Sequence, residues 1–419
     1  MQENKTCYNF IDLFAGAGGL SEGFLSTGFK PIAHVEMNVE ACLTLQTRVC
    51  YYYLLKTGRI DIYHQYLCGE ITREHLYLQV PSTELNMVIN QTMSKESMPE
   101  LYARIDYLME KQQIESVDLI IGGPPCQAYS LVGRAVKSDG MQDDPRNFLY
   151  QLYFRVLKRY QPEMFIFENV PGLLTASGGK YFFNLKKGFK RFGYQIDFKI
   201  LNAHDFGVLQ NRLRVILIGW KKGTDYKFPE FNRVSSTYTV KEIFKDLPIL
   251  QAGDINNVYR TNRLNKYLRE AGIRNSNDIL TWNIARPHNE RDKEIYRLVI
   301  DTWNQSKTRL KYPDLPEELK THKNTTAFLD RFKVVASDIP ACHTVMAHIA
   351  KDGHYFIHPD IHQARSITVR EAARLQSFPD NFYFESSRTA AFTQIGNAVP
   401  PLMAKGLALG ILGELERKV

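Results

Sequence analysis

Strand-length apolar runs alternate with amphipathic segments through the first 220 residues, and no other feature of the sequence restricts the fold as strongly. The runs are continuous and rich in β-branched side chains, and they occupy residues 8–14, 30–37, 117–123, 164–170 and 214–220. Strands that are covered on both faces of a sheet have this composition. The sequence therefore predicts an α/β fold built on a doubly wound parallel sheet, in which ligands bind at the carboxyl ends of the strands.

The alternation stops near residue 221 and does not return before about residue 365. The intervening segment is polar and interrupted by prolines, and it holds 24 Lys or Arg against 18 Asp or Glu, so that +6 of the formal net charge of +8 lies there. This excess favours a polyanionic partner, with a solvated basic face as the simpler alternative. We predict a first domain over 1–220, a second, smaller domain over 221–365, and a segment over 366–419 that returns to complete the first domain.

Other features limit the class of protein. No apolar run reaches the roughly 20 residues that span a bilayer, and the N-terminus lacks a secretory signal, so we expect no membrane partner and a cytoplasmic location. The six cysteines show no CxxC or metal-ligand spacing, which favours reduced thiols. The five histidines between residues 343 and 362 also lack the compact spacing of metal ligands, so we predict no metal site and interpret them as scaffolding of the second domain.

The stretch DLFAGAGGL follows the first strand and opens a helix. Its glycines Gly16, Gly18 and Gly19 allow a tight turn and a close approach of the backbone to a ligand. Glu36 ends the next strand, where an acid can accept hydrogen bonds from ribose hydroxyls. The two features together favour a nucleotide-type cofactor, with a solvated strand-end carboxylate as the alternative for Glu36.

Three later strand ends carry reactive or charged side chains. Cys126 follows GGPP at the end of the strand at 117–123, and a thiol in such a loop is a candidate nucleophile, because a structural cysteine would be expected inside the apolar run. Glu168 would lie beside this thiol, where a protonated carboxyl can donate to a ring nitrogen; a turn-forming role is the alternative. Arg212 and Arg214 alternate at the start of the last run and need anionic or carbonyl partners, with a structural salt bridge as the alternative.

Together with Glu36, several stretches resemble, in this order, the motifs of the cytosine carbon-5 DNA methyltransferases: DLFAGAGGL, GGPPCQAYS, FENVPGLL, QNRLRVILIG, RSITVREAARLQSFPD and QIGNAVPP. The resemblance covers roughly residues 1–50, 117–220 and 365–419, about half of the chain, and the PPCQ, ENV and QxRxR set is its most specific part. It implies a Rossmann-like class I methyltransferase sheet with a second, smaller target-recognition domain, which would be the segment 221–365.

The resemblance also implies catalytic roles. Cys126 is the expected nucleophile, which adds to carbon 6 of cytosine so that carbon 5 can attack the methyl group of S-adenosylmethionine. Glu168 resembles the residue that binds and protonates ring nitrogen 3. Arg214 resembles the arginine that holds the base carbonyl, and Arg212 its neighbour near the thiol and a phosphate. We expect Asn169 to support the loop that carries Cys126.

For the cofactor S-adenosylmethionine, with S-adenosylhomocysteine as product, the resemblance implies contacts from the Gly-rich turn, the strand ends and the C-terminal motif: Phe14, Gly16, Gly18, Gly19, Glu36, Met37, Asn90, Pro125, Leu149, Asn397 and Val399. Two positions depart from the family pattern. Met37 stands where an aromatic residue often stacks on adenine, and it can pack on the ring through its sulfur. No acid for the adenine amine is evident; Glu70 and Asn90 are both candidates, and the expected order of strand, helix and Cys126 strand favours Asn90.

These features predict a DNA cytosine-5 methyltransferase, nucleoid-associated in a bacterial cytoplasm, that protects host DNA in a restriction-modification system. Its partners would be double-stranded DNA, from which the target cytosine flips out, and a cognate restriction endonuclease that shares the site without forming a stable complex. We expect a monomer, with residues 127–147 as a loop that closes over the base. A transfer-RNA cytosine-5 methyltransferase and an inactive DNA-binding homologue are the alternatives. The long basic middle segment argues against the former and the intact Cys126 set against the latter.

Overall fold

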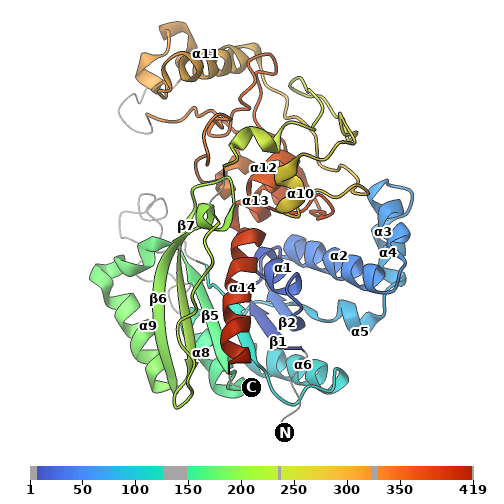
Figure 1. The fold of residues 1–419 in the computed structure, drawn as a ribbon, viewed down its shortest axis with the longest axis vertical. Coiled ribbons are helices and arrows are strands. Elements are labelled where there is room, and N and C mark those ends of the chain that lie inside the picture. Colours follow the sequence, from blue (N-terminus) through green and yellow to red (C-terminus); the bar gives the residue numbers. More distant parts are fainter. Residues whose placement is uncertain (1–6, 126–148, 235–236, 322–328, 418–419) are drawn as a thin grey trace.

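The structure is a computed structural model that describes residues 7–125, 149–234, 237–321 and 329–417. It has two parts, one above the other along the long axis (Figure 1). The lower part holds the sheet and the helices that cover it, and the upper part holds the middle of the chain together with two helices from the C-terminal segment.

The lower part is built on a seven-stranded sheet in the order β3-β2-β1-β4-β5-β7-β6. In chain order the strands are β1 Asn9–Leu13, β2 Lys30–Glu36, β3 Val88–Asn90, β4 Leu119–Gly122, β5 Met164–Asn169, β6 Tyr194–Asn202 and β7 Leu213–Lys221. The predicted α/β fold class is confirmed.

One strand departs from the prediction. β7 runs antiparallel to both of its neighbours, so a wholly parallel sheet is wrong at this position. The connection from β6 to β7 contains a single 3-10 turn, Ala203–Phe206, and it is too short for the crossover of a dozen or more residues that parallel strands require. A prediction based on continuous apolar runs does not detect β6, because polar and apolar residues alternate along this edge strand.

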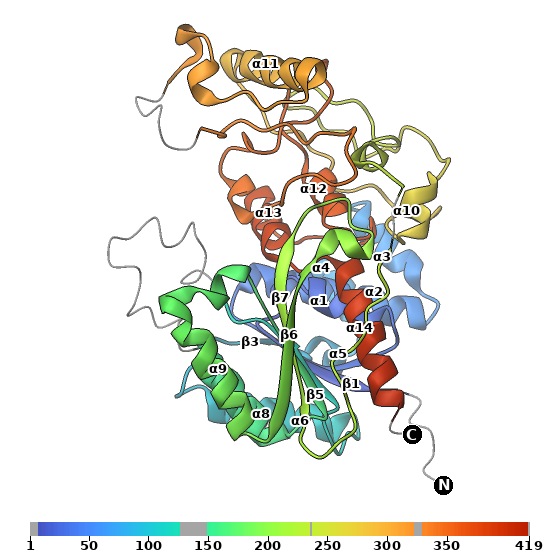
Figure 2. The same ribbon diagram turned by 60° about the vertical axis from the view of Figure 1, so that its left-hand side comes forward.

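Helices cover both faces of the sheet (Figures 1 and 2). Adjacent residues of β1 face opposite cores, Ile11 toward one and Phe10 toward the other. The helices of the first core are α6 Met98–Lys111, α8 Leu149–Tyr160 and α9 Lys180–Arg191, and those of the second are α1 Gly19–Leu25 and α14 Pro401–Glu416. One helical stretch of the described residues, Arg388–Glu416, is long and apolar enough to cross a membrane, but 61% of its apolar window is buried inside the protein, as in a core helix.

Within residues 51–112, to which the sequence assigns no role, the part that precedes β3 builds a small helical layer at the edge of the sheet. Here α2 Val39–Lys56 packs against α3 Ile60–Leu67, α4 Arg73–Leu78 and α5 Ser82–Leu85. Tyrosines of this layer bind the C-terminal segment: the Tyr63 hydroxyl donates to the carbonyl of Asn381 over 2.8 Å, and the Tyr66 hydroxyl donates to the buried carboxylate of Glu385 over 2.7 Å. The layer therefore holds the returning chain in place.

The upper part contains α10 Lys266–Glu270, α11 Glu290–Ser306, α12 Val369–Leu375 and α13 Arg388–Asn397. The described residues of this part form isolated bridges instead of a sheet. Its main core combines residues on both sides of position 365, such as Ile243 and Val345 with Val369 and Phe392. The domain boundaries at 221 and 365 stay predictions, and this shared core joins the two segments.

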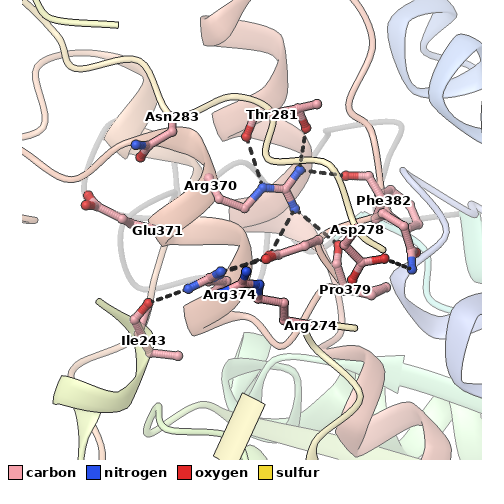
Figure 3. Close-up of polar contacts among 12 residues, drawn as sticks. Ile243, Arg274, Asp278, Thr281, Asn283, Arg370, Glu371, Arg374, Pro379 and Phe382 are labelled. Carbon is pink, nitrogen blue, oxygen red and sulfur yellow. Dashed lines mark hydrogen bonds and ion pairs between the residues drawn. The ribbon is translucent and has the colours of Figure 1, made fainter. Parts of the chain in front are cut away.

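Buried charges cross the same junction (Figure 3). Arg374 of α12 pairs with Asp246 and with Asp380, with N–O distances of 2.6 Å in both cases, and none of the three side chains is more than 1% exposed. Asp246 also pairs with Arg274, and Arg370 lies 3.7 Å from Asp380. Because unpaired charges are costly in the interior, this network ties the middle of the chain to the C-terminal segment.

Candidate active site

The Gly-rich turn carries the chain away from the carboxyl end of β1. Phe14, Gly16 and Gly18 have positive φ angles of 58°, 55° and 88°, a conformation that glycine adopts readily and other residues rarely. A Cβ on Gly19 would lie only 2.4 Å from the carbonyl oxygen of Val399. Glycine at this position therefore lets the segment before α14 pack directly on the turn.

The carboxylate of Glu36 is fixed at the end of β2. It accepts hydrogen bonds from the backbone N–H groups of Gly16 and Asn38, each over 2.8 Å. A carboxylate has about four acceptor positions, so two remain for the hydroxyls of a ligand. The turn and the acid, which the sequence places together only by topology, are thus in direct contact.

A cavity of about 470 Å³ opens beside these residues. Its walls come from the ends of β1, β2, β4 and β5, from the segment after β3 and from α13. The predicted residues that line it are Phe14, Gly16, Gly19, Glu36, Met37, Pro125, Leu149, Glu168, Arg214, Asn397 and Val399. The predicted cofactor residues and two predicted catalytic residues therefore share one space.

Glu168 and Arg214 form an ion pair in this cavity. The Nε atom of Arg214 lies 2.6 Å from Oε1 of Glu168, and the two side chains are 12% and 17% exposed. They meet because β5 ends where its antiparallel neighbour β7 begins. A Cβ on Gly123 would lie 2.7 Å from Oε2 of Glu168, so a glycine leaves room for the carboxylate. The pair presents acceptors and donors of fixed position, as the polar edge of a base requires.

The loop after β4 is held from β5. Nδ2 of Asn169 donates to the carbonyl of Pro124 over 3.2 Å, the contact expected of a residue that supports this loop. Pro124 and Pro125 line the cavity. Cys126 and the predicted closing loop at 127–147 lie outside the described residues, which end at Pro125 on this side.

Comparisons with known proteins agree with this site. The family model of the C-5 cytosine-specific DNA methylases matches residues 8–67 and 91–412. The chain belongs to this family. The methylase is 44% identical to the type II methyltransferase M.Bpa9945I of Bacillus paralicheniformis over 96% of this chain and 98% of that protein. It is 31% identical to M1.HphI of Haemophilus parahaemolyticus over 96% of this chain and 86% of that protein. It is a DNA cytosine-5 methyltransferase.

Solved structures share the fold. The methylase superimposes on a proposed DNA modification methyltransferase encoded within a prophage (E. coli) with a TM-score of 0.63 and 23% identity, over 97% of this chain and 99% of that one. It superimposes on the Entamoeba histolytica methyltransferase EhMeth with a TM-score of 0.55 and 14% identity, over 98% of this chain and 99% of that one.

Of the predicted site residues that the structure describes, three do not line the cavity of the methylase: Gly18, Asn90 and Arg212. The Asn90 side-chain amide turns toward its own neighbours and donates to the carbonyls of Glu36 and Met37. It also donates to the thiol of Cys42, whose pKa burial raises to about 11. Arg212 is 1% exposed. It donates to the carbonyls of Val345 over 2.7 Å and Gly396 over 2.8 Å, so it joins the segment before β7 to the upper part, α13 included.

Other residues of the methylase line the cavity without having been predicted: Gln91, Thr92, Met93, Ala390, Thr393 and Gln394. The first three follow β3, and the rule that ligands lie at strand ends would have indicated them once β3 was placed. The last three share one face of α13 with Asn397 through the i, i+3, i+4 spacing. The side chain of Glu70, the other candidate for the adenine amine, is not part of the lining.

Proposed function

We propose that this methylase transfers a methyl group from S-adenosylmethionine to carbon 5 of a cytosine flipped out of a short, specific duplex sequence, through a covalent adduct of Cys126. The single observation that supports this proposal most is the shared cavity, in which the Glu36 carboxylate and the Glu168–Arg214 pair line the same space. A cofactor and a base must meet in one closed space for a direct transfer between them. Cys126 follows Pro125, which is part of this lining.

The residues present fit S-adenosylmethionine, which supplies the methyl group when bound. Glu36 keeps acceptor positions for ribose hydroxyls, and a side chain at Gly16 would meet nothing within 4 Å, so the turn is open to a ligand. Met37 is 62% exposed at the cavity, where its thioether can pack on a flat ring. Gln91 lines the same cavity, and its Oε1 has no hydrogen-bond donor among the described residues, so it is a better placed acceptor for an adenine amine than Asn90.

On the base side, each residue has a distinct task. Glu168 binds the edge of cytosine that carries ring nitrogen 3 and the exocyclic amine. In its protonated form it gives its proton to that nitrogen as the Cys126 thiolate adds to carbon 6, and it is left as the carboxylate that pairs with Arg214. Arg214 holds Glu168 in place and donates to the base carbonyl. Because the pair is mostly buried, its hydrogen bonds are stronger than they would be in water.

The relatives that are named type II methyltransferases support a protective role in a restriction-modification system. We propose that the methylase acts as a monomer on host DNA in a bacterial cytoplasm, in association with the nucleoid. A cognate endonuclease would recognise the same sequence without forming a stable complex with it.

Two substitutions test the proposed roles separately. Glu36→Gln weakens S-adenosylmethionine binding and leaves DNA affinity unchanged, because the acid contacts only the cofactor side. Glu168→Gln leaves cofactor affinity unchanged and lowers the single-turnover rate of methyl transfer by about 100-fold or more, as expected for the loss of a group that stabilises the transition state. Equal effects of the two variants on cofactor affinity and on the rate of methyl transfer would contradict the assignment of Glu36 to the cofactor and Glu168 to the base.

A further inference from the structure

Arg388 is a cation for which the described residues provide no counterion. It is the first residue of α13 and is partly buried. The described part of the chain offers it no hydrogen bond or ion pair, and its Nε atom is shielded from water without an acceptor. An N–H group that loses water and gains no acceptor is destabilising, so this position requires an explanation.

A second guanidinium, that of Arg286, lies close to it. Arg286 donates to the carbonyls of Lys351 over 2.6 Å, Ile349 over 3.0 Å and Ala350 over 3.2 Å, and it lies 5.9 Å from the ring of Phe392, one helical turn after Arg388. Burial, and then the charge of Arg388, lower the pKa of Arg286. Neutral carbonyls fix the position of Arg286 and leave its charge uncompensated.

Asp352 is the carboxylate whose charge raises the pKa of Arg286, whereas the charge of Arg388 lowers it. The neighbouring His288 has a pKa lowered to about 4, first by burial and then by Arg286 and other cations, so this ring is neutral at pH 7. The two arginines therefore repel each other and His288 adds no negative charge between them; an anion with oxygens in a plane or a tetrahedron would bind such a pair.

The pair lies close to the active site. Ala390, Thr393, Gln394 and Asn397, on another face of the same helix, line the cavity, and α13 has 10 residues, about 15 Å in length. Both views place α13 where the sheet part and the upper part meet (Figures 1 and 2). Arg388 itself does not line the cavity, so its anion is distinct from the carboxylate of the cofactor.

We propose that Arg388 and Arg286 together bind a backbone phosphate of the DNA strand whose base enters the cavity. The contact is independent of sequence, and it sets the position of the strand relative to Glu168 and Arg214. The inference rests on the proposed function, because it requires duplex DNA at the cavity. Arg286, bonded to three backbone carbonyls, provides the fixed half of the site, and Arg388 provides a guanidinium that no described residue binds.

The test is the salt dependence of DNA binding. Each phosphate contact adds about 0.9 to the slope of log K against log salt concentration. Fluorescence anisotropy with a labelled duplex of arbitrary sequence, between about 50 and 200 mM salt, should show a slope smaller by about 1 for Arg388→Gln and an affinity about tenfold weaker at low salt. Arg388→Lys should keep the slope. Arg417→Gln, at the C-terminal cap of α14, is the matched control and should change neither quantity.

Three outcomes would overturn the proposal. One is an unchanged slope and affinity for Arg388→Gln. Another is a loss of affinity for S-adenosylhomocysteine with DNA binding intact, which would make the anion the carboxylate of the cofactor. The third is an equal change in Arg417→Gln, which would indicate a general charge effect. Binding is measured without methyl transfer, so a wild-type chain that binds no DNA contradicts the proposed function itself, whereas normal binding by Arg388→Gln contradicts the phosphate site alone.

Discussion

Replacing Asp246 by Asn tests whether the buried charge network holds the two parts of the molecule together. Asp246 is 1% exposed and is bonded to both Arg274 and Arg374. Asparagine keeps the shape and one acceptor oxygen but removes the charge, and Arg274 then has no carboxylate among its described contacts. Breaking a buried pair in this way costs about 3–5 kcal/mol, because a charge is left in the interior without compensation.

This cost converts to a change in melting temperature. An unfolding entropy of about 2.1 cal/mol/K per residue, over 419 residues, is about 0.9 kcal/mol/K for a single cooperative unit. The expected decrease in Tm is therefore about 3–6 °C. Circular dichroism during a thermal ramp, with urea unfolding as a second measurement, provides the assay.

The matched control is Asp106→Asn. Asp106 pairs with Arg159 at the surface, where the two side chains are 42% and 44% exposed, and exposed pairs contribute about 0–1 kcal/mol. We expect a change in Tm of about 1 °C or less. Equal changes in the two variants, or a change below about 1 °C for Asp246→Asn, would refute the argument that removing one partner of this buried network leaves a costly uncompensated charge.

Two further predictions concern stability. Burial lowers the pKa of His343 from 6.5 to about 4 and that of His358 from 6.5 to about 3. Below pH 6.5 the unfolded chain therefore takes up protons that the folded chain excludes. The free energy of unfolding is highest above pH 6.5 and falls as the pH drops toward 4, by up to about 1.4 kcal/mol per pH unit for each histidine. Urea unfolding midpoints measured across this pH range test this prediction, and midpoints that do not change with pH would contradict it. Gly19→Ala should destabilise the fold by about 1–3 kcal/mol, because the new Cβ meets the Val399 carbonyl. Gly413→Ala in α14, where the new Cβ meets nothing within 4 Å, should stabilise the fold by up to about 1 kcal/mol. A change in the free energy of unfolding of the same sign in both variants would contradict the two predictions.

Much of the site could be predicted from the sequence, because its residues stand at strand ends. Glu36 is the last residue of β2 and Glu168 the last but one of β5, and parallel strands bring their carboxyl ends to one edge of the sheet. Arg214 reaches the same edge only because β7 is antiparallel, so the residue was predicted for the site while the direction of its strand was not.

The directions of side chains could not be predicted in this way. Asn90 ends β3 as Glu36 ends β2, yet its amide is bonded to backbone carbonyls that the sequence does not place beside it. Arg212 is two residues from Arg214, and its partners, Val345 and Gly396, lie more than 100 positions further along the chain. Contacts of such long range follow from packing, and short-range patterns carry no information about them.

The central claim, methyl transfer to DNA cytosine through Cys126, is tested most directly by bisulfite sequencing. The chain and its Cys126→Ala variant would be expressed in a host that lacks cytosine-5 methylation, and the genomic DNA of both would be sequenced. The account predicts cytosines protected from conversion within one short recurring sequence for the wild type and none for the variant. Protected DNA cytosines in the Cys126→Ala strain, or their absence in a wild-type strain that produces folded protein, would contradict it.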